Sequence, residues 1–253
     1  MNILNPSKFS RDELSSIELQ PFSEQLKPII KETLIETEKT KRNRKGTIFT
    51  PMFTVFVVLG IAMRHDLSYS KVVNWIISTV RWLSLSLPQK IFKEGTVTKA
   101  RQYLGVEVFS RIFEKFNQQH YVLDPDFYGR NTVIFDGVAA TIPDTPSNNN
   151  RFGKPSNDKG SAAFPQIRIV ALLSLPLRCI LDVAYGPFIG KGNGERALMA
   201  QILYQFRDKS LLFLLDAGFY SFELIEHFKI THQNFVMKLD STVKVKYIKY
   251  FRG

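Results

Sequence analysis

The chain has 253 residues, of which 44% are hydrophobic and 23% are charged, and this composition is typical of a globular protein and excludes a disordered chain. Its 34 Lys and Arg residues outnumber the 23 Asp and Glu residues, so the net charge is +11. Such a charge favours a polyanionic partner. The alternative is an ordinary basic protein with solvated lysines, because net charge alone reports on solubility and nonspecific binding.

The cysteine and histidine content argues against disulfides and zinc. Cys179 is the only cysteine, which excludes a disulfide framework and fits a reducing, cytoplasmic compartment. The four histidines show no ligand spacing. The N-terminus lacks the basic start and apolar stretch of a secretion signal. The apolar run at residues 48–63 is shorter than the roughly 20 residues of a membrane span, so we expect a buried helix there and no membrane partner.

Residues 1–46 are expected to form a polar, basic N-terminal segment. Helical spacing within it is shown by Leu26, Ile29, Ile30 and Leu34. The basic cluster at residues 39–45 is either a solvated linker or a phosphate-binding segment.

Residues 47–125 are expected to form a helical domain that binds DNA. Pro51 suits the first turn of a core helix that ends near residue 63. Ser70 is expected to cap a second helix, at residues 71–83, whose apolar side chains share one side. The tryptophans at positions 75 and 82 are expected to be core or half-exposed packing residues.

A short amphipathic helix follows, expected to be capped by Thr96 and ended by Gly105, before a further helix at residues 106–116. Its apolar side chains share one face. The outward residues are Thr98, Lys99, Arg101 and Gln102. A basic polar face of this kind fits a recognition helix in the major groove, although ordinary amphipathic helices have the same pattern.

The sequence period changes after residue 121, and turn-forming residues mark a domain boundary. A polar loop is expected at residues 148–160. Helices are expected at residues 195–206 and 221–228. Strands are expected at residues 132–136, 166–175, 178–185, 211–216 and 234–239.

Three strands followed by alternating helices and strands form the ribonuclease H-like plan, in which the first and fourth strands are neighbours. The predicted fold class is therefore α/β, with an N-terminal all-helical domain followed by an incomplete ribonuclease H-like mixed sheet flanked by helices. The core is expected to span residues 126–240. Neighbouring first and fourth strands place Asp136 beside Asp216.

Each of these aspartates follows an apolar β-rich run and precedes a glycine or Ala-Gly. Carboxylate oxygens at two strand ends can hold divalent cations such as Mg²⁺ or Mn²⁺ for phosphoryl transfer, although a third acid normally completes the set. A lone Asp-Gly after a strand is most often a turn. The occurrence of both at matching ends of the core predicts that Asp136 and Asp216 are metal ligands and catalytic residues.

Short motifs support this prediction. They are Val-Ile-Phe-Asp-Gly at 133–137, Pro-Asp-Thr-Pro at 143–146, Phe-Gly at 152–153, Ala-Phe-Pro-Gln-Ile-Arg-Ile-Val-Ala-Leu at 163–172, Gly-Glu at 194–195 and Leu-Asp-Ala-Gly-Phe-Tyr-Ser at 215–221. In order and spacing they resemble the DDE transposases of insertion-sequence family 4, over roughly residues 45–240.

The resemblance implies an enzyme that uses metal-activated water to nick transposon ends, after which the freed 3′-hydroxyl attacks target DNA. The implied partners are double-stranded DNA, both transposon ends and target, and a second copy of the chain in a homodimer on DNA. The implied location is the bacterial cytoplasm, with the nucleoid. Expected DNA contacts are Lys99, Arg101, Gln102 and Arg168, although Arg168 could instead pair with an acid near the site.

This chain also differs from the pattern of the family in one respect. Its members carry a β-rich insertion and then a helix with the third acid, and residues 241–253 resemble only the start of that insertion. We therefore expect a truncated chain that is inactive alone. Glu195, Glu223 and Glu226 are the nearest remaining carboxylates, and their expected role is to complement helix dipoles.

Two other functions stay open. One is a regulator that binds transposon ends or mixes with active subunits without cutting. The other is a structure-specific nuclease that uses Asp136, Asp216 and a nearby glutamate.

Overall fold

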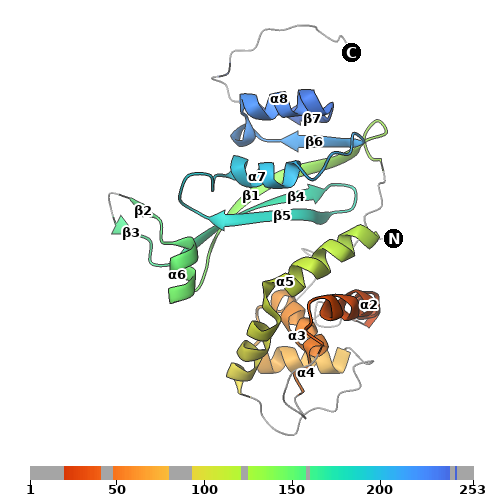
Figure 1. Cartoon of the computed structure of the whole chain (residues 1–253), viewed down its shortest axis with the longest axis vertical. Helices are drawn as coiled ribbons and strands as arrows, with labels where there is room; N and C mark the ends of the chain where they lie inside the picture. Colours follow the sequence, from red (N-terminus) through yellow and green to blue (C-terminus); the bar gives the residue numbers. More distant parts are fainter. Residues whose placement is uncertain are drawn as a thin grey trace. The chain divides into compact units, whose positions relative to one another are not determined.

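The computed structural model of the chain describes residues 20–40, 48–79, 93–120, 125–157, 160–239 and 243. The chain divides into two compact units, Met1–His120 and Tyr121–Gly253. Figure 1 labels the helices and strands of both. Trp82 and all of residues 241–253 except Val243 lie outside the described residues.

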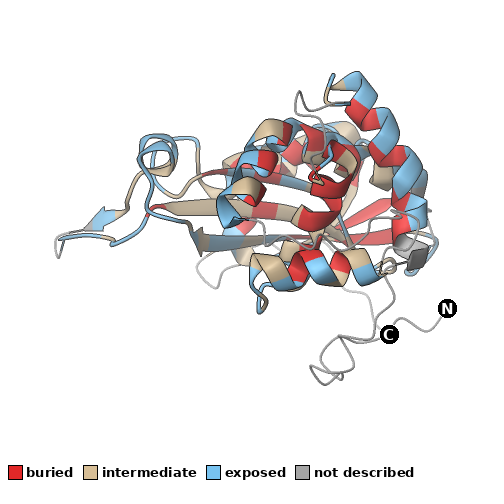
Figure 2. Cartoon of the chain, turned by 90° about the horizontal axis from the view of Figure 1, so that it is seen from below, coloured by how far each residue is buried: buried red, intermediate tan, exposed pale blue. Residues whose placement is uncertain are grey.

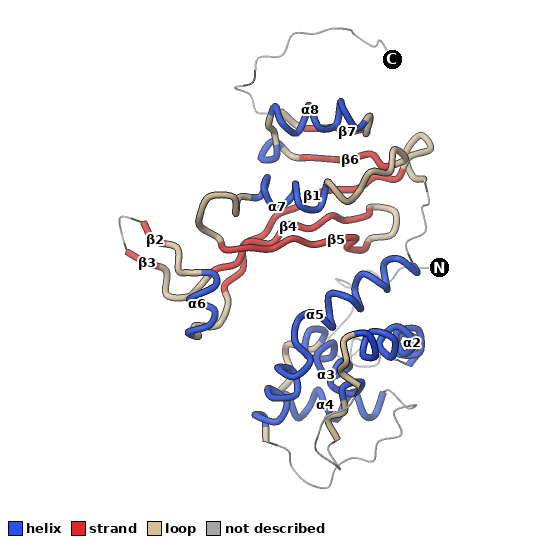
Figure 3. Tube along the Cα trace, viewed as in Figure 1, coloured by secondary structure: helices blue, strands red, loops and turns tan. Residues whose placement is uncertain are grey.

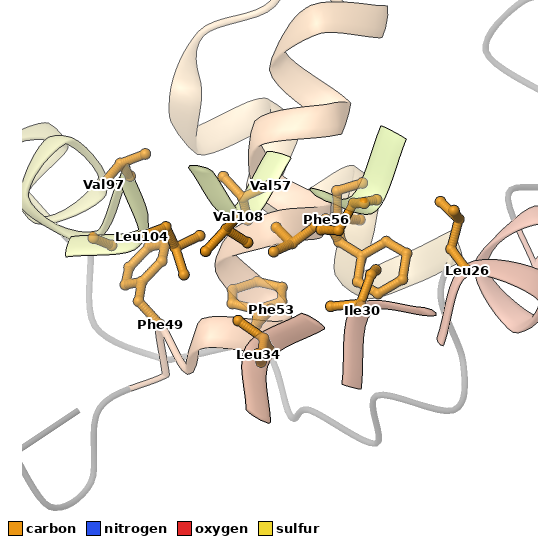
Figure 4. Packing of buried hydrophobic residues seen from close by; sticks show 14 of the residues in the cluster. Leu26, Ile30, Leu34, Phe49, Phe53, Phe56, Val57, Val97, Leu104 and Val108 are labelled. Carbon is orange, nitrogen blue, oxygen red and sulfur yellow. The ribbon is translucent and has the colours of Figure 1, made fainter. Parts of the chain in front are cut away.

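The described part of the first unit is helical. Its elements are α2 (Gln20–Glu36), α3 (Pro51–Met63), α4 (Tyr69–Thr79) and α5 (Glu94–His120). Buried side chains from all four helices form one hydrophobic core, part of which Figure 4 shows around Phe53. None of the described helices is long and apolar enough to cross a membrane.

Helix α3 is the centre of that core. The side chain of Thr50 accepts a hydrogen bond from the Phe53 amide at 3.2 Å, and Pro51 occupies the first turn, as predicted. Phe53, Val55 and Val57 have no exposed surface. The expectation of a buried helix here is confirmed.

Helix α2 packs against α3 and α5, although it lies within the segment expected to be polar and basic. The four side chains picked out by helical spacing are all buried, namely Leu26, Ile29, Ile30 and Leu34. Burial of this stripe makes α2 part of the same core as the later helices.

Helix α5 consists of two helical stretches that meet at Gly105, whose φ of 73° lies in the left-handed region that glycine tolerates. Val97, Ala100 and Leu104 are buried before this break, as their spacing predicts. The first stretch begins at Glu94, before the expected cap. Helix α4 likewise begins at Tyr69, so Ser70 is inside the helix rather than its cap, and Trp75 is half-buried as expected.

The second unit is built on a five-stranded mixed sheet in the order β5-β4-β1-β6-β7 (Figure 3). Antiparallel pairing joins β1 to β4 and β4 to β5, and parallel pairing joins β1 to β6 and β6 to β7. The strands are β1 (Asn131–Thr141), β4 (Gln166–Ser174), β5 (Cys179–Pro187), β6 (Leu211–Leu215) and β7 (Asn234–Met237). The predicted ribonuclease H-like plan is confirmed, because the first and fourth of these strands are neighbours.

Helices α7 (Glu195–Leu203) and α8 (Phe222–Thr231) pack on the same face of this sheet. Phe213 of β6 stacks 6.1 Å from Phe135 of β1 and lies 5.3 Å from Phe228 of α8, between ring centroids. Figure 2 shows the buried residues concentrated along the sheet and on the inner sides of the helices. A buried aromatic layer thus fixes the two central strands beneath the helices.

Two expectations about this unit are wrong in detail. The polar loop at residues 148–160 contains helix α6 (Pro146–Phe152) and the two short strands β2 (Ser156–Asn157) and β3 (Gly160–Ser161). Thr145 caps α6 by accepting a hydrogen bond from the Asn148 amide. Strand β1 also does not end at Asp136, because β4 pairs with it as far as Thr141.

Candidate functional site

The site is built where β1 and β6 run side by side. Their parallel register pairs Val133 with Phe213 and Ile134 with Leu214. The register ends at this last pair, and β6 ends at Leu215, one residue before Asp216. Asp136 and Asp216 therefore each lie two residues beyond the Ile134–Leu214 pair, on neighbouring segments that are far apart in the sequence.

Both aspartates project from the sheet face opposite α7 and α8. The residue before each one, Phe135 or Leu215, is buried under the helices, and successive side chains of a strand point to opposite faces. Asp136 is paired with Ala171 on β4, on this same face. Both carboxylates are exposed to solvent.

Backbone amides hold one oxygen of each carboxylate. Asp136 Oδ1 accepts a hydrogen bond from the Gly137 amide at 2.8 Å. Asp216 Oδ1 accepts one from the Gly218 amide at 2.9 Å and so caps the short 3-10 helix η3 (Ala217–Phe219), which buried Phe219 anchors. Each bond holds one oxygen of a carboxylate in place, and carboxylate oxygens are the ligands that hard cations prefer.

Another acid of this region is Glu195, at the start of α7. Its side chain lies against Gly137, where an added Cβ atom would be only 2.8 Å from Glu195 Cδ. Gly137 faces α7 rather than the face that carries Asp136. Within the described residues, no group of three or more His, Cys, Asp or Glu side chains could hold a metal ion.

Arg168 on β4 is surrounded by protein groups. Its Nη1 donates to the Asn193 carbonyl at 3.1 Å, its guanidinium lies 4.5 Å from the ring centroid of Phe188, and its Nε is 4.0 Å from Glu195 Oε1. The side chain is only 20% exposed. Arg168 was expected either to contact DNA or to pair with an acid near the site. The structure provides an acid for the second role, namely Glu195.

The other two glutamates occupy the surface of α8. Glu223 lies in its first turn, where a negative charge complements the helix dipole. Glu226 lies 3.9 Å from Lys229, measured from Oε2 to Nζ, in a solvent-exposed pair. Their positions fit the structural roles expected of them.

The expected DNA-contacting residues of the first unit are exposed on α5. Lys99 and Gln102 belong to its outer face. Arg101 does too, but its Nη1 donates to the hydroxyl of Tyr69 at 3.2 Å. The structure therefore presents a basic, polar surface on the first stretch of α5.

Arg196 is a residue of the site region that the sequence analysis did not single out. Its Nε donates to the Gly218 carbonyl at 3.0 Å, two residues after Asp216. Arg196 is the second residue of α7, and no sequence motif marks it as a contact of the turn after β6. The contact becomes visible only in the structure, where α7 packs near the end of β6.

Comparison with known proteins finds similarity to transposases. A family profile described as "Insertion element 4 transposase N-terminal" matches residues 16–114. The transposase InsG for insertion sequence element IS4 of Escherichia coli K12 is 27% identical over 191 residues, which are 73% of this chain and 41% of InsG. The putative transposase InsZ of the same organism is 28% identical over 159 residues, 59% of this chain and 52% of InsZ.

Among solved structures, a piggyBac transposase synaptic complex with hairpin DNA matches with a TM-score of 0.38 and 12% identity, over 93% of this chain and 53% of that chain. The aligned regions amount to about half the length of the curated relatives. The profile match and both relatives show that the chain is similar to transposases of the insertion element 4 type, with the profile matching only residues 16–114.

Proposed function

We propose that this chain acts in DNA transposition, by binding transposon-end DNA and by holding divalent metal for phosphodiester hydrolysis and strand transfer. The observation that supports the proposal is the parallel register of β1 and β6, in which Asp136 and Asp216 each lie two residues beyond the Ile134–Leu214 pair. The proposed partners, transposon-end and target DNA, follow from the family and from the basic composition of the chain.

The donor set fits a hard cation. Two exposed carboxylates, each with one oxygen held by a backbone amide, offer the oxygen ligands that Mg²⁺ and Mn²⁺ prefer. The metal would supply an activated water or hydroxyl and would neutralise charge on the phosphate. Asp136 and Asp216 would bind and orient it, while the buried aromatic layer beneath them would keep the two strand ends at a constant separation.

Metal binding tests this pair directly. We expect Mn²⁺ binding, measured by electron paramagnetic resonance, to weaken at least about tenfold in Asp136→Asn and in Asp216→Asn, because each change removes an anionic ligand. Asp182→Asn is the matched control, since Asp182 Oδ1 also accepts a hydrogen bond from the next amide, at 2.7 Å. Equal Mn²⁺ affinity in all four proteins would refute the metal pair.

The chain alone is proposed to cut DNA poorly, because the described site supplies two carboxylates where a set of three is usual in this chemistry. A regulator that binds transposon ends without cutting is the second candidate, and the exposed basic surface of α5 favours it. Incubation with a terminal inverted repeat and Mn²⁺ separates the two. Nicking that Asp216→Asn abolishes supports the enzyme, whereas a gel shift without nicking supports the regulator.

A further inference from the structure

We infer that the first turn of α7 positions both carboxylates of the site, with Arg196 acting on Asp216 and Glu195 acting on Asp136. This inference rests on the proposed function of the aspartate pair. Glu195 and Arg196 are consecutive, and each contacts a glycine whose amide donates to one of the two carboxylates. They act from the helix-covered side of the sheet, so they are positioning residues and not metal ligands.

Arg196 acts through Gly218. Its Nε donates to the Gly218 carbonyl at 3.0 Å, and the Gly218 amide donates to Asp216 Oδ1 at 2.9 Å. Gly218 therefore accepts the hydrogen bond from α7 and donates the hydrogen bond that orients the Asp216 carboxylate. Two backbone hydrogen bonds of this turn are short-range, from the Phe219 amide to the Asp216 carbonyl and from the Tyr220 amide to the Ala217 carbonyl, whereas the Arg196 bond joins the turn to a separate helix.

Glu195 acts through Gly137. The side chain lies where a Cβ atom of residue 137 would stand, 2.8 Å from Cδ and 3.2 Å from Oε1, so the contact requires glycine. The Gly137 amide donates to Asp136 Oδ1. Arg168 supports Glu195 from the other side, because its Nε is 4.0 Å from Oε1 and its Nη1 holds the Asn193 carbonyl just before α7.

The two contacts together fix the relative placement of the carboxylates. Asp136 lies within a strand that continues past it, whereas Asp216 lies in a turn after its strand has ended. A turn is more mobile than a paired strand. We therefore expect Arg196 to matter more for metal binding than Glu195 does, because the less constrained carboxylate depends more on its support.

The test of the Arg196 contact compares Arg196→Met with Arg207→Met in the full chain. Arg207 is a matched control, since its Nε also donates to a backbone carbonyl, that of Tyr204 at 3.4 Å, away from the site. For Arg196→Met we expect the Mn²⁺ dissociation constant to rise about tenfold, as for lost supporting partners of metal ligands. We also expect faster hydrogen exchange at the Gly218 amide, whereas Arg207→Met should change neither quantity.

The test of the Glu195 contact compares one variant that removes the side chain with one that keeps its shape and removes only its charge. Glu195→Ala should speed hydrogen exchange at the Gly137 amide and weaken Mn²⁺ binding by a smaller factor than Arg196→Met does. Glu195→Gln keeps the shape of the side chain and should restore values near those of the unchanged chain. Failure of that rescue would overturn the packing role.

Exchange and metal binding separate the two ideas. If the unchanged chain binds no Mn²⁺ but Arg196→Met still speeds exchange at Gly218, the proposed metal pair fails and the positioning contact stands. If Asp216→Asn abolishes Mn²⁺ binding while Arg196→Met changes neither binding nor exchange, the positioning inference is overturned. Should Arg196→Met fail to fold, Arg196→Gln gives the same readouts with a shorter donor.

Discussion

A paired lysine of the helical unit and the two candidate carboxylates of the sheet unit are held in different ways. In the helical unit, Lys115 on α5 forms ion pairs with Glu32 and Glu36 on α2, at 2.6 and 2.7 Å from Nζ to Oε1. In the sheet unit, Asp136 and Asp216 are exposed and accept hydrogen bonds from nearby backbone amides. The difference shows that the Lys115 pairs support packing between two helices, whereas the sheet unit presents Asp136 and Asp216 to solvent.

The largest expected effect tests whether the two cores are independent. Phe213→Ala removes a fully buried ring from the aromatic layer of the sheet, and such changes cost about 3–5 kcal/mol of unfolding free energy. Both tryptophans belong to the helical unit, so their fluorescence reports on that unit alone. We expect the far-ultraviolet circular dichroism transition to move to lower temperature while the fluorescence transition stays in place.

A shift of both transitions together would show that the units unfold as one. Phe53→Ala is the reciprocal change, in the core of the helical unit. It should move the fluorescence transition, because Trp75 packs against that same core.

The next effect concerns close packing between α3 and α4. A Cβ atom on Gly60 would lie 2.9 Å from Ile76 Cδ1 and 3.0 Å from Val72 Cγ1, so Gly60→Ala overpacks the core and should cost about 1–3 kcal/mol, despite the higher helix propensity of alanine. Gly95→Ala, in α5, has no atom within 4 Å of its added Cβ and should be neutral or stabilising. Chemical denaturation of both variants checks this, and equal stabilities would contradict it.

A smaller effect should appear as pH dependence in the sheet unit. Burial, together with the charge of Arg207, lowers the pKa of His227 below its ordinary value of 6.5, while a hydrogen bond with Gln233 acts in the opposite direction. The unfolded chain therefore binds a proton at a higher pH than the folded chain does. The stability that neutral His227 contributes is fully present above about pH 6.5. This contribution is lost as the pH falls through that value toward the lower pKa of the folded state.

Urea denaturation at pH 8 and pH 5.5 measures this loss. His227→Phe keeps a ring against Tyr204, which packs edge-on to His227, and removes the titrating group. We expect the variant to lose less stability between the two pH values than the unchanged chain loses. An identical loss in both proteins would assign the pH dependence to other groups.

The smallest expected effect distinguishes exposed from paired cations on α5. Lys99→Ala should weaken binding to transposon-end DNA severalfold and reduce the slope of log affinity against log salt by about one, as expected for one lost phosphate contact. Lys115→Ala is the control, because Lys115 is engaged by two glutamates. Equal losses in a gel-shift titration would indicate nonspecific charge rather than a binding surface.

Local sequence pattern was sufficient to predict features that belong to a single helix or strand. The spacing of Leu26, Ile29 and Leu34 predicted a helix, which the structure shows with these side chains buried, and Gly105 predicted the break in α5. Helix α6 was missed because its residues are polar and carry no apolar period, although Thr145 before a proline is a helix-start signal that could have found it.

The sequence by itself determined the order of the strands along the chain, the two aspartates that follow apolar β-rich runs and the motifs of the family resemblance, because hydrophobic period and turn residues are local properties. Tertiary structure decided the parallel register of β1 and β6, the continuation of β1 past Asp136 and the contact of Arg196 with Gly218. These features depend on which segments pair and on how α7 packs over the sheet. Long-range pairing of this kind is set by the shape and burial of the whole core, and local sequence does not encode it.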